Sequence, residues 1–162
     1  MSGVANYSKI FNLEGRTAIV TGGSRGIGLA LAEGLAAHGA DVAIVVKSTV
    51  DRAETAAQAI RAAGRRALVI KADVSSEQDV ARTADEVTAQ WGRIDILVNN
   101  AGIVLPARAE DCTLDTWRQT MAVNLDGVFF TFRAASRHIM GAMAAVRTPR
   151  AVSGWRKGQC MA

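Results

Sequence analysis

The stretch TAIVTGGSRGIG, residues 17–28, decides the fold of this chain. Its first five residues form a short β-branched run, which predicts a buried strand. A glycine-rich turn follows, and then Ile27, Leu31 and Leu35 recur every four residues, which predicts a helix ending near residue 39. A turn between a strand and a helix offers a bound anion free backbone amides and the positive end of the helix dipole. The stretch therefore predicts a phosphate-binding turn, and the alternative is an ordinary glycine turn.

Strands and helices alternate through the rest of the chain. We expect strands at 41–46, 67–70 and 96–98, because each is a short apolar run rich in β-branched residues. We expect a helix at 51–63 and another from about residue 124 to about 145. Between the third and fourth strands we expect a further helix, which Gly92 ends. Strands separated by helices of this length are typical of parallel strands with crossover helices.

Polar residues mark the starts of two of these helices. Ser75 with Gln78 is interpreted as a capping box, in which the two side chains bond the first free amides of the helix. The apolar stripe of that helix consists of Val80, Ala84, Val87 and Trp91. Thr113 is expected to cap a later helix that carries Trp117.

The fold class that follows is α/β: a doubly wound, Rossmann-like parallel sheet, incomplete, with about four strands and their crossover helices. Residues 1–145 would form this partial dinucleotide-binding domain, and residues 146–162 a basic irregular tail. In a sheet of this type the strand at 96–98 would be an exposed edge, apolar on both faces. We therefore expect a marginal fold that tends to associate.

Composition narrows the function classes. The chain has 162 residues, of which 49% are hydrophobic, and no stretch approaches the ~20 apolar residues of a membrane helix. With no signal-peptide segment, a cytoplasmic protein is expected. The net charge of +4 lies in the last 18 residues, which hold four cations and no acid, so no basic face predicts a nucleic-acid partner. Two cysteines and two histidines, without ligand spacing, predict no metal site.

Four motifs occur together at the expected ends of strands and helices. The glycine turn has the spacing GxxxGxG, Asp73-Val74 follows the third strand, Asn99-Asn100-Ala101-Gly102 follows the fourth, and Asn124 lies in VNLDG. In this combination the chain resembles the short-chain dehydrogenase/reductase family from about Gly15 to about Met140. The resemblance implies a Rossmann-like fold, a small-molecule carbonyl or alcohol substrate, and hydride transfer between that substrate and a nicotinamide.

The resemblance also implies which residues meet the cofactor. Asp73 would accept a hydrogen bond from the adenine amino group, with Val74 packed by the ring, and Asn99, Ala101 and Gly102 would border the adenosine ribose. The residues placed at or near the diphosphate are Gly22, Ser24, Arg25, Gly26, Ile27 and Gly28. The alternatives are a turn aspartate for Asp73 and simple strand termination for the NNAG turn.

Charge at the end of the second strand bears on the choice of cofactor. An NAD site usually has an acidic residue ~20 residues after the glycine turn, which accepts from the ribose 2′-hydroxyl. Here the sequence reads Val45-Val46-Lys47-Ser48, with no acid, and Arg25 lies in the turn itself. Two cations near the ribose favour NADP(H), with NAD(H) as the alternative. Lys47 can also be interpreted as a solvated loop residue.

The residues for catalysis are incomplete. Asn124 resembles the asparagine that, in intact family members, holds a water of the proton relay through its helix backbone; the alternative is a satisfied polar residue in a helix bend. The family's Tyr-x-x-x-Lys pair occurs nowhere, because the only tyrosine is Tyr7 and the only lysine after Lys71 is Lys157. The fifth strand with its serine is also missing, and we interpret the weak match at Ala151–Gly154 as coincidence.

Three functions are therefore weighed. The chain is an oxidoreductase of this family, a non-catalytic dinucleotide-binding fragment, or a basic interaction module acting through its tail. We expect it to keep cofactor binding and to lack activity. The tail is interpreted as an out-of-frame or prematurely ended translation, with a genuine basic tail as the alternative. Homo-oligomers through the helices carrying Trp117 and Phe129–Phe132 are what the resemblance implies.

Overall fold

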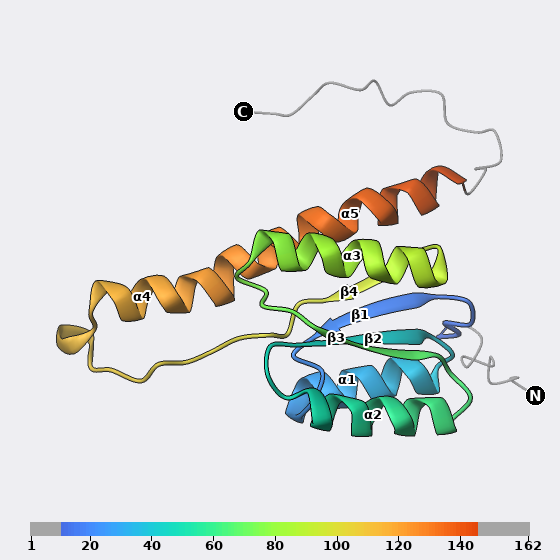
Figure 1. Cartoon of the computed structure of the whole chain (residues 1–162), viewed down its shortest axis with the longest axis horizontal. Helices are drawn as coiled ribbons and strands as arrows, with labels where there is room; N and C mark the ends of the chain where they lie inside the picture. The colour runs from blue at the N-terminus through green and yellow to red at the C-terminus, as the bar shows by residue number, and fades with distance from the viewer. Residues whose placement is uncertain (1–10, 146–162) are drawn as a thin grey trace, which may run out of the picture.

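The computed structural model describes residues 11–145, so the expectations for residues 146–162 lie outside the described residues. Four parallel strands form one sheet in the order β3-β2-β1-β4 (Figure 1). The strands are β1 (Thr17–Thr21), β2 (Asp41–Val46), β3 (Ala67–Lys71) and β4 (Ile96–Val98). Ala18 of β1 pairs with Val42 of β2 on one side and with Ile96 of β4 on the other. The predicted parallel, Rossmann-like α/β sheet is confirmed, and β3 is one residue longer than expected.

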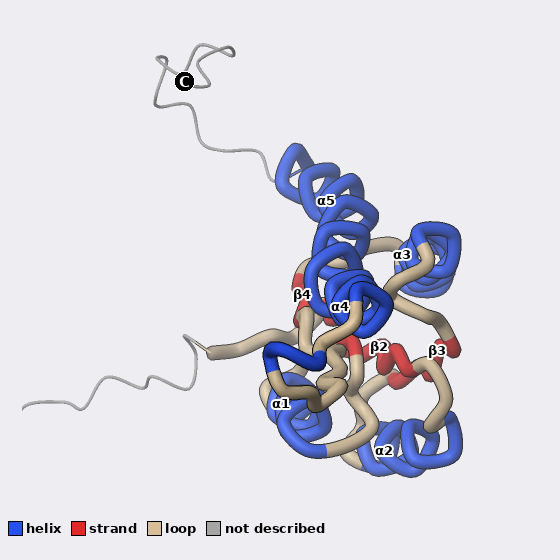
Figure 2. Tube along the Cα trace, turned by 90° about the vertical axis from the view of Figure 1, so that its left-hand side faces the viewer, coloured by secondary structure: helices blue, strands red, loops and turns tan. Residues whose placement is uncertain are grey.

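Helices cover both faces of the sheet. Helices α1 (Gly26–Ala37) and α2 (Val50–Ala62) lie on one face, and α3 (Glu77–Trp91) and α5 (Gly127–Ala145) on the other (Figure 2). Beyond the carboxyl ends of the strands, a 3₁₀ turn η2 (Ala109–Asp111) leads to α4 (Leu114–Met121), and a π-helical turn η3 (Ala122–Asp126) joins α4 to α5. None of the helices in the described part of the chain is long and apolar enough to cross a membrane.

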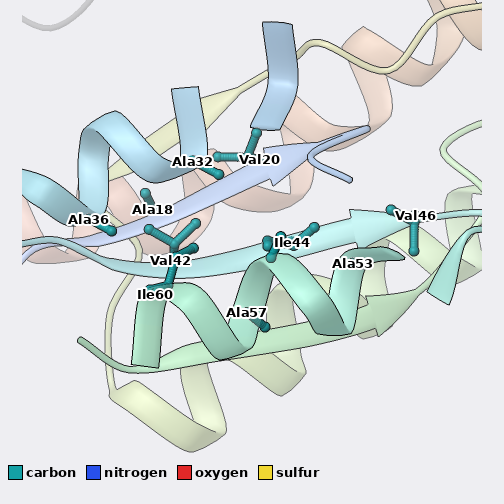
Figure 3. Packing of buried hydrophobic residues seen from close by; sticks show 11 residues of the cluster. Ala18, Val20, Ala32, Ala36, Val42, Ile44, Val46, Ala53, Ala57 and Ile60 are labelled. Carbon is teal, nitrogen blue, oxygen red and sulfur yellow. The ribbon is translucent and has the colours of Figure 1, made fainter. Parts of the chain in front are cut away.

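The core is a pair of apolar layers with β2 at the centre. All six residues of β2 are buried, because a parallel strand with helices on both faces leaves neither side to solvent. Val42, Ile44 and Val46 pack toward α1 and α2 (Figure 3), whereas Ala43 and Val45 belong to the layer under α3 and α5. Each buried valine or isoleucine contributes roughly 1.5–3 kcal/mol.

Helix α1 packs on the sheet through its smallest residues. Gly28, Ala32 and Ala36 are its buried positions, and Ala32 lies beside Val20 of β1 in Figure 3. Ile27 and Leu31 are 75% and 41% exposed. The four-residue spacing predicted the helix correctly, but the buried side is the small one, because small residues let the helix lie close to the strand.

The helix starts give one confirmation and one correction. The Thr113 side chain accepts a hydrogen bond from the Thr116 amide, so the predicted cap of α4 is confirmed. The capping box assigned to Ser75 and Gln78 is wrong. Ser76 caps α3 by accepting from the Asp79 amide, and Ser75 is turned back toward the preceding loop.

Asp95 fastens the amino ends of β1 and β4 together. Its carboxylate accepts hydrogen bonds from the Thr17 amide, from Arg93 at 2.7 Å and from Arg16 at 2.9 Å. Burial of the group would raise the pKa of Asp95, but the hydrogen bonds from Arg93, the Thr17 amide and Arg16 outweigh burial, and the pKa lies below the usual value of 3.8.

This carboxylate predicts a loss of stability in acid. A pKa lowered in the folded state stabilises the fold above the unfolded value, and that stability is lost as the pH falls below about 4 through the folded pKa. We expect the urea midpoint of the wild type to fall more steeply below this pH than that of Asp95→Asn, which is less stable at neutral pH. Parallel pH profiles for the two proteins would contradict the role given to Asp95.

Candidate functional site

A cleft of about 790 Å³ opens at the carboxyl ends of the strands. Such crevices are where open parallel sheets bind their ligands, and the volume suits a ligand pocket, which measures roughly 300–1,000 Å³. Most of the residues predicted to meet the cofactor line it: Gly22, Ser24, Arg25, Gly26, Ile27, Gly28, Lys47, Asp73, Val74, Ala101 and Gly102. The fold thus brings residues from four separate loops to one place.

Glycines in the first turn are required by its geometry. Gly22 and Gly26 have φ angles of +68° and +54°, in the left-handed region that favours glycine. A Cβ on Gly28 would lie 2.4 Å from both the Asn100 Nδ2 and the Gly22 carbonyl oxygen, so helix α1 begins in contact with the NNAG turn. A Cβ on Gly26 would meet nothing within 4 Å, so the space beside this residue is open.

The start of α1 is free to bind an anion. Its N-cap residue, Arg25, makes no capping hydrogen bond through its side chain, and the first turn contains no acidic residue. In contrast, α3 and α4 each have a capping side chain and an acid in the first turn. The first amides of α1 therefore point without side-chain partners toward a cleft, which is the arrangement that holds a phosphate.

Thr21 and Asn100 join the glycine turn to the NNAG turn. The Thr21 hydroxyl accepts from the Asn100 and Ala101 amides, both at 3.0 Å, and donates to the Val98 carbonyl. The Asn100 side-chain amide donates to the carbonyls of Thr21 and Gly22. Thr21 is 2% exposed, so this junction is a fixed floor under the two turns. Sequence reasoning quoted both residues without giving them this role, because the partners are about 80 positions apart.

A second hydrogen bond fixes the other side of the turn. The buried Ser24 hydroxyl lies 2.7 Å from the hydroxyl of Thr49, the N-cap residue of α2. Ser24 therefore links the glycine turn to the loop after β2, where Lys47 and Ser48 line the cleft. Sequence spacing did not indicate this contact.

An ion pair spans the cleft between the ends of β2 and β3. Lys47 Nζ lies 2.6 Å from Asp73 Oδ2, and Ser75 donates to Asp73 Oδ1 from its amide at 3.0 Å and its hydroxyl at 2.7 Å. Burial would raise the pKa of Asp73, but the hydrogen bonds from Lys47 and Ser75 and the charge of Lys47 lower it below its ordinary value. Asp73 is thus an ionised acceptor at the rim.

Two predicted site residues do not line the cleft. Asn99 Oδ1 accepts from the Thr131 hydroxyl of α5 at 2.5 Å, on the side of the sheet that α5 covers, and its neighbour Asn100 lines the cleft instead. The Asn124 side chain accepts from the Ile103 amide at 2.9 Å and donates to the Ile103 carbonyl at 2.8 Å. Asn124 therefore lies in a π-helical bend and ties that bend to the loop after the NNAG turn.

The sequence matches a family of known proteins. A family model described as short chain dehydrogenase matches residues 16–147. An uncharacterized oxidoreductase of Methylorubrum extorquens is 40% identical over 127 residues, which are 78% of this chain and 51% of that protein.

Solved structures agree with the sequence matches. A short-chain dehydrogenase from Burkholderia cenocepacia in complex with NADP is 46% identical, with a TM-score of 0.77, covering 79% of this chain and 52% of the other. A blue fluorescent protein from a metagenomic library, in complex with NADPH, is 41% identical, with a TM-score of 0.74, covering 78% and 52%. The chain thus spans about half the length of the proteins it matches.

Proposed function

This chain belongs to the short-chain dehydrogenase family, and from that premise we propose that it is the dinucleotide-binding part of an NAD(P)-dependent oxidoreductase. The observation that carries the proposal is the uncapped start of α1, which faces the cleft between Gly22 and Gly28. The cofactor's diphosphate would lie on the Gly26, Ile27 and Gly28 amides. When bound, the nicotinamide supplies or accepts the hydride.

The adenosine half would lie across the ends of β2 and β3. Asp73 and Val74 line the cleft there, and the buried Val74 offers an apolar surface for a purine ring. Ala101 and Gly102 would border the ribose, with Asn100 rather than Asn99 as the polar neighbour. The Asp73 carboxylate is an acceptor for the adenine amino group.

NADP(H) is the cofactor that the charges favour. Lys47 and Arg25 both line the cleft, and the end of β2 carries no acid to accept from a ribose 2′-hydroxyl. Two solved relatives hold NADP or NADPH. A 2′-phosphate is a dianion that pairs with such cations more strongly than a hydroxyl does.

We infer that the 162-residue chain binds the cofactor without turning it over. Its only tyrosine is Tyr7, and no Tyr-x-x-x-Lys pair exists in the sequence to exchange a proton with a carbonyl oxygen. Asn124 would correspond to the family's catalytic asparagine. Its side chain is hydrogen-bonded to the amide and the carbonyl of Ile103.

Two assays on the full chain test this function. NADPH fluorescence should change saturably on titration with the protein, with weaker binding of NADH. NADPH oxidation with a panel of ketones should stay at background. A folded protein that binds neither nucleotide would overturn the proposed cofactor site. Turnover above background would overturn only the inference that the chain is inactive, and the cofactor site would stand.

We also propose that α4, η3 and α5 pair with a second copy of the chain. Six exposed apolar side chains lie on these elements: Leu114, Trp117, Leu125, Val128, Phe129 and Phe132. From Leu125 onward they are related by three or four positions, so they lie on one side of the helix. Trp117 is 56% and Phe132 is 61% exposed. Monomeric proteins rarely leave so many large apolar side chains exposed on neighbouring elements, and a self-complementary two-fold contact would bury them.

The pairing predicts a change of mass on substitution. Trp117→Glu together with Phe132→Glu should convert a dimer or larger assembly to a monomer in sedimentation at micromolar concentration, because two charges cannot be buried at the contact. Gln90→Glu, on the exposed side of α3, adds charge elsewhere and should leave the mass unchanged. A wild-type chain that sediments as a monomer would rule the pairing out.

A further inference from the structure

The two oxygens of the Asp73 carboxylate have different partners. Oδ1 accepts two hydrogen bonds from Ser75, which belongs to the same turn. Oδ2 is paired with the charge of Lys47, which comes from the neighbouring strand end. One oxygen is therefore held by local backbone geometry, and the other by a long side chain from a separate loop.

The lysine is the more exposed member of this pair. The Lys47 side chain is 69% exposed, whereas that of Asp73 is 26% exposed. The backbone of Asp73 is fixed as well, because its amide donates to Asp79 Oδ2 at 2.9 Å and the next residue, Val74, is buried. An ion pair whose lysine is exposed adds little net stability, so a dianionic phosphate can draw the lysine away.

We propose that Lys47 exchanges between Asp73 Oδ2 and the 2′-phosphate of NADP(H), and that this exchange restores the full negative charge of the oxygen that accepts from the adenine amino group. The proposal rests on the proposed cofactor site. It makes Asp73 a specificity-determining residue through Lys47: recognition of the phosphate and recognition of the base become coupled.

The coupling makes the hydrogen bond to the adenine amino group stronger with NADPH than with NADH. With NADPH, Lys47 moves to the phosphate, and Asp73 Oδ2 is free to accept from the base. With NADH no phosphate competes for the lysine, so the adenine amino group must share Oδ2 with Lys47, whose positive charge weakens the hydrogen bond to the base. The same carboxylate would otherwise repel the phosphate, and Lys47 lies where it neutralises that charge.

Four ligands measure the coupling directly. They are NADPH, NADH and the two analogues in which hypoxanthine replaces adenine, so that a carbonyl stands where the amino donor was. Calorimetric titration of the full chain gives the effect of the amino group with and without the 2′-phosphate. Removing the amino group should weaken NADPH binding about tenfold, because a hydrogen bond to a charged acceptor is lost, and should weaken NADH binding by less than about twofold.

Lys47→Met removes the competitor for Oδ2. In this variant the amino group should matter equally for both cofactors, and the preference for NADPH over NADH should shrink. Lys71→Met is the matched control: Lys71 ends β3, is exposed and is not among the residues that line the cleft, so the coupling should persist. Circular dichroism checks that both variants are folded.

The outcomes are distinct. An amino-group effect of the same size for NADPH and NADH in the wild type would overturn the exchange while leaving the cofactor site intact. Coupling that survives in Lys47→Met would assign it to another group and overturn the role of Lys47. Absence of NADPH binding by the folded wild type would instead overturn the proposed function itself.

Discussion

Replacing Gly28 by alanine should weaken NADPH binding at least about tenfold and lower the thermal midpoint. The added Cβ would lie 2.4 Å from the Gly22 carbonyl oxygen, a backbone atom that moves only if the glycine turn moves. Overpacking of this kind costs about 1–3 kcal/mol, and tenfold in affinity corresponds to about 1.4 kcal/mol. NADPH fluorescence titration and thermal unfolding measure the two effects on the same sample.

Gly34→Ala is the matched control. It makes the same substitution on the same helix, at a residue where an added Cβ would meet nothing within 4 Å. Alanine is about 0.5–1 kcal/mol more favourable than glycine inside a helix, so this variant should be as stable as the wild type or more so, with unchanged affinity. If Gly28→Ala behaves like Gly34→Ala, the close contact between α1 and the NNAG turn has been misjudged.

Replacing Thr21 by valine should destabilise the fold by about 2 kcal/mol or more, because each buried polar group left without a partner costs about 1–3 kcal/mol. Valine keeps the shape of threonine, but the Asn100 and Ala101 amides lose their common acceptor and the Val98 carbonyl loses a donor. NADPH affinity should fall as well, since the glycine turn rests on this junction. Urea unfolding monitored by circular dichroism gives the free energy.

Thr88→Val provides the comparison for this loss. The Thr88 hydroxyl makes one hydrogen bond, to the Ala84 carbonyl in its own helix, and no amide depends on it. Its replacement should cost less than about 1 kcal/mol. Equal destabilisation by the two substitutions would show that the Thr21 hydroxyl does no more than an ordinary helix hydroxyl.

Much of this fold could be predicted from local patterns. Three of the four strands have the predicted bounds, because glycines and polar turns on either side of a short β-branched run mark where the strand begins and ends. The glycine turn could be recognised because the positive φ angles at Gly22 and Gly26 favour glycine at these two positions. The glycines therefore recur at a fixed spacing in the sequence.

Features that depend on contacts between distant segments were not predictable. Ser75 and Ser76 are adjacent and chemically identical, so only the path of the chain decides that Ser76 caps α3 while Ser75 binds Asp73. Asn99 and Asn100 pose the same problem. Adjacent side chains of an extended segment point to opposite faces, and only the packing of the whole chain decides that Asn99 faces α5 and Asn100 lies under the glycine turn. The pairing of Lys47 with Asp73 likewise requires knowing that β2 and β3 are neighbours.

The central claim is that the cleft at the carboxyl ends of β1, β2 and β3 is the dinucleotide site. A titration of ¹⁵N-labelled protein with NADP⁺, followed by amide resonances, tests it most directly. The predicted result is that the amides of Gly26, Ile27 and Gly28 shift most, together with those of the loops at Asp73 and Ala101. The amide resonances of Gly39, Gly64 and Gly92 should not shift, because these glycines precede β2, β3 and β4 at the amino ends of the strands, away from the cleft. Shifts confined to those three glycines, or no shifts at millimolar NADP⁺, would contradict the claim.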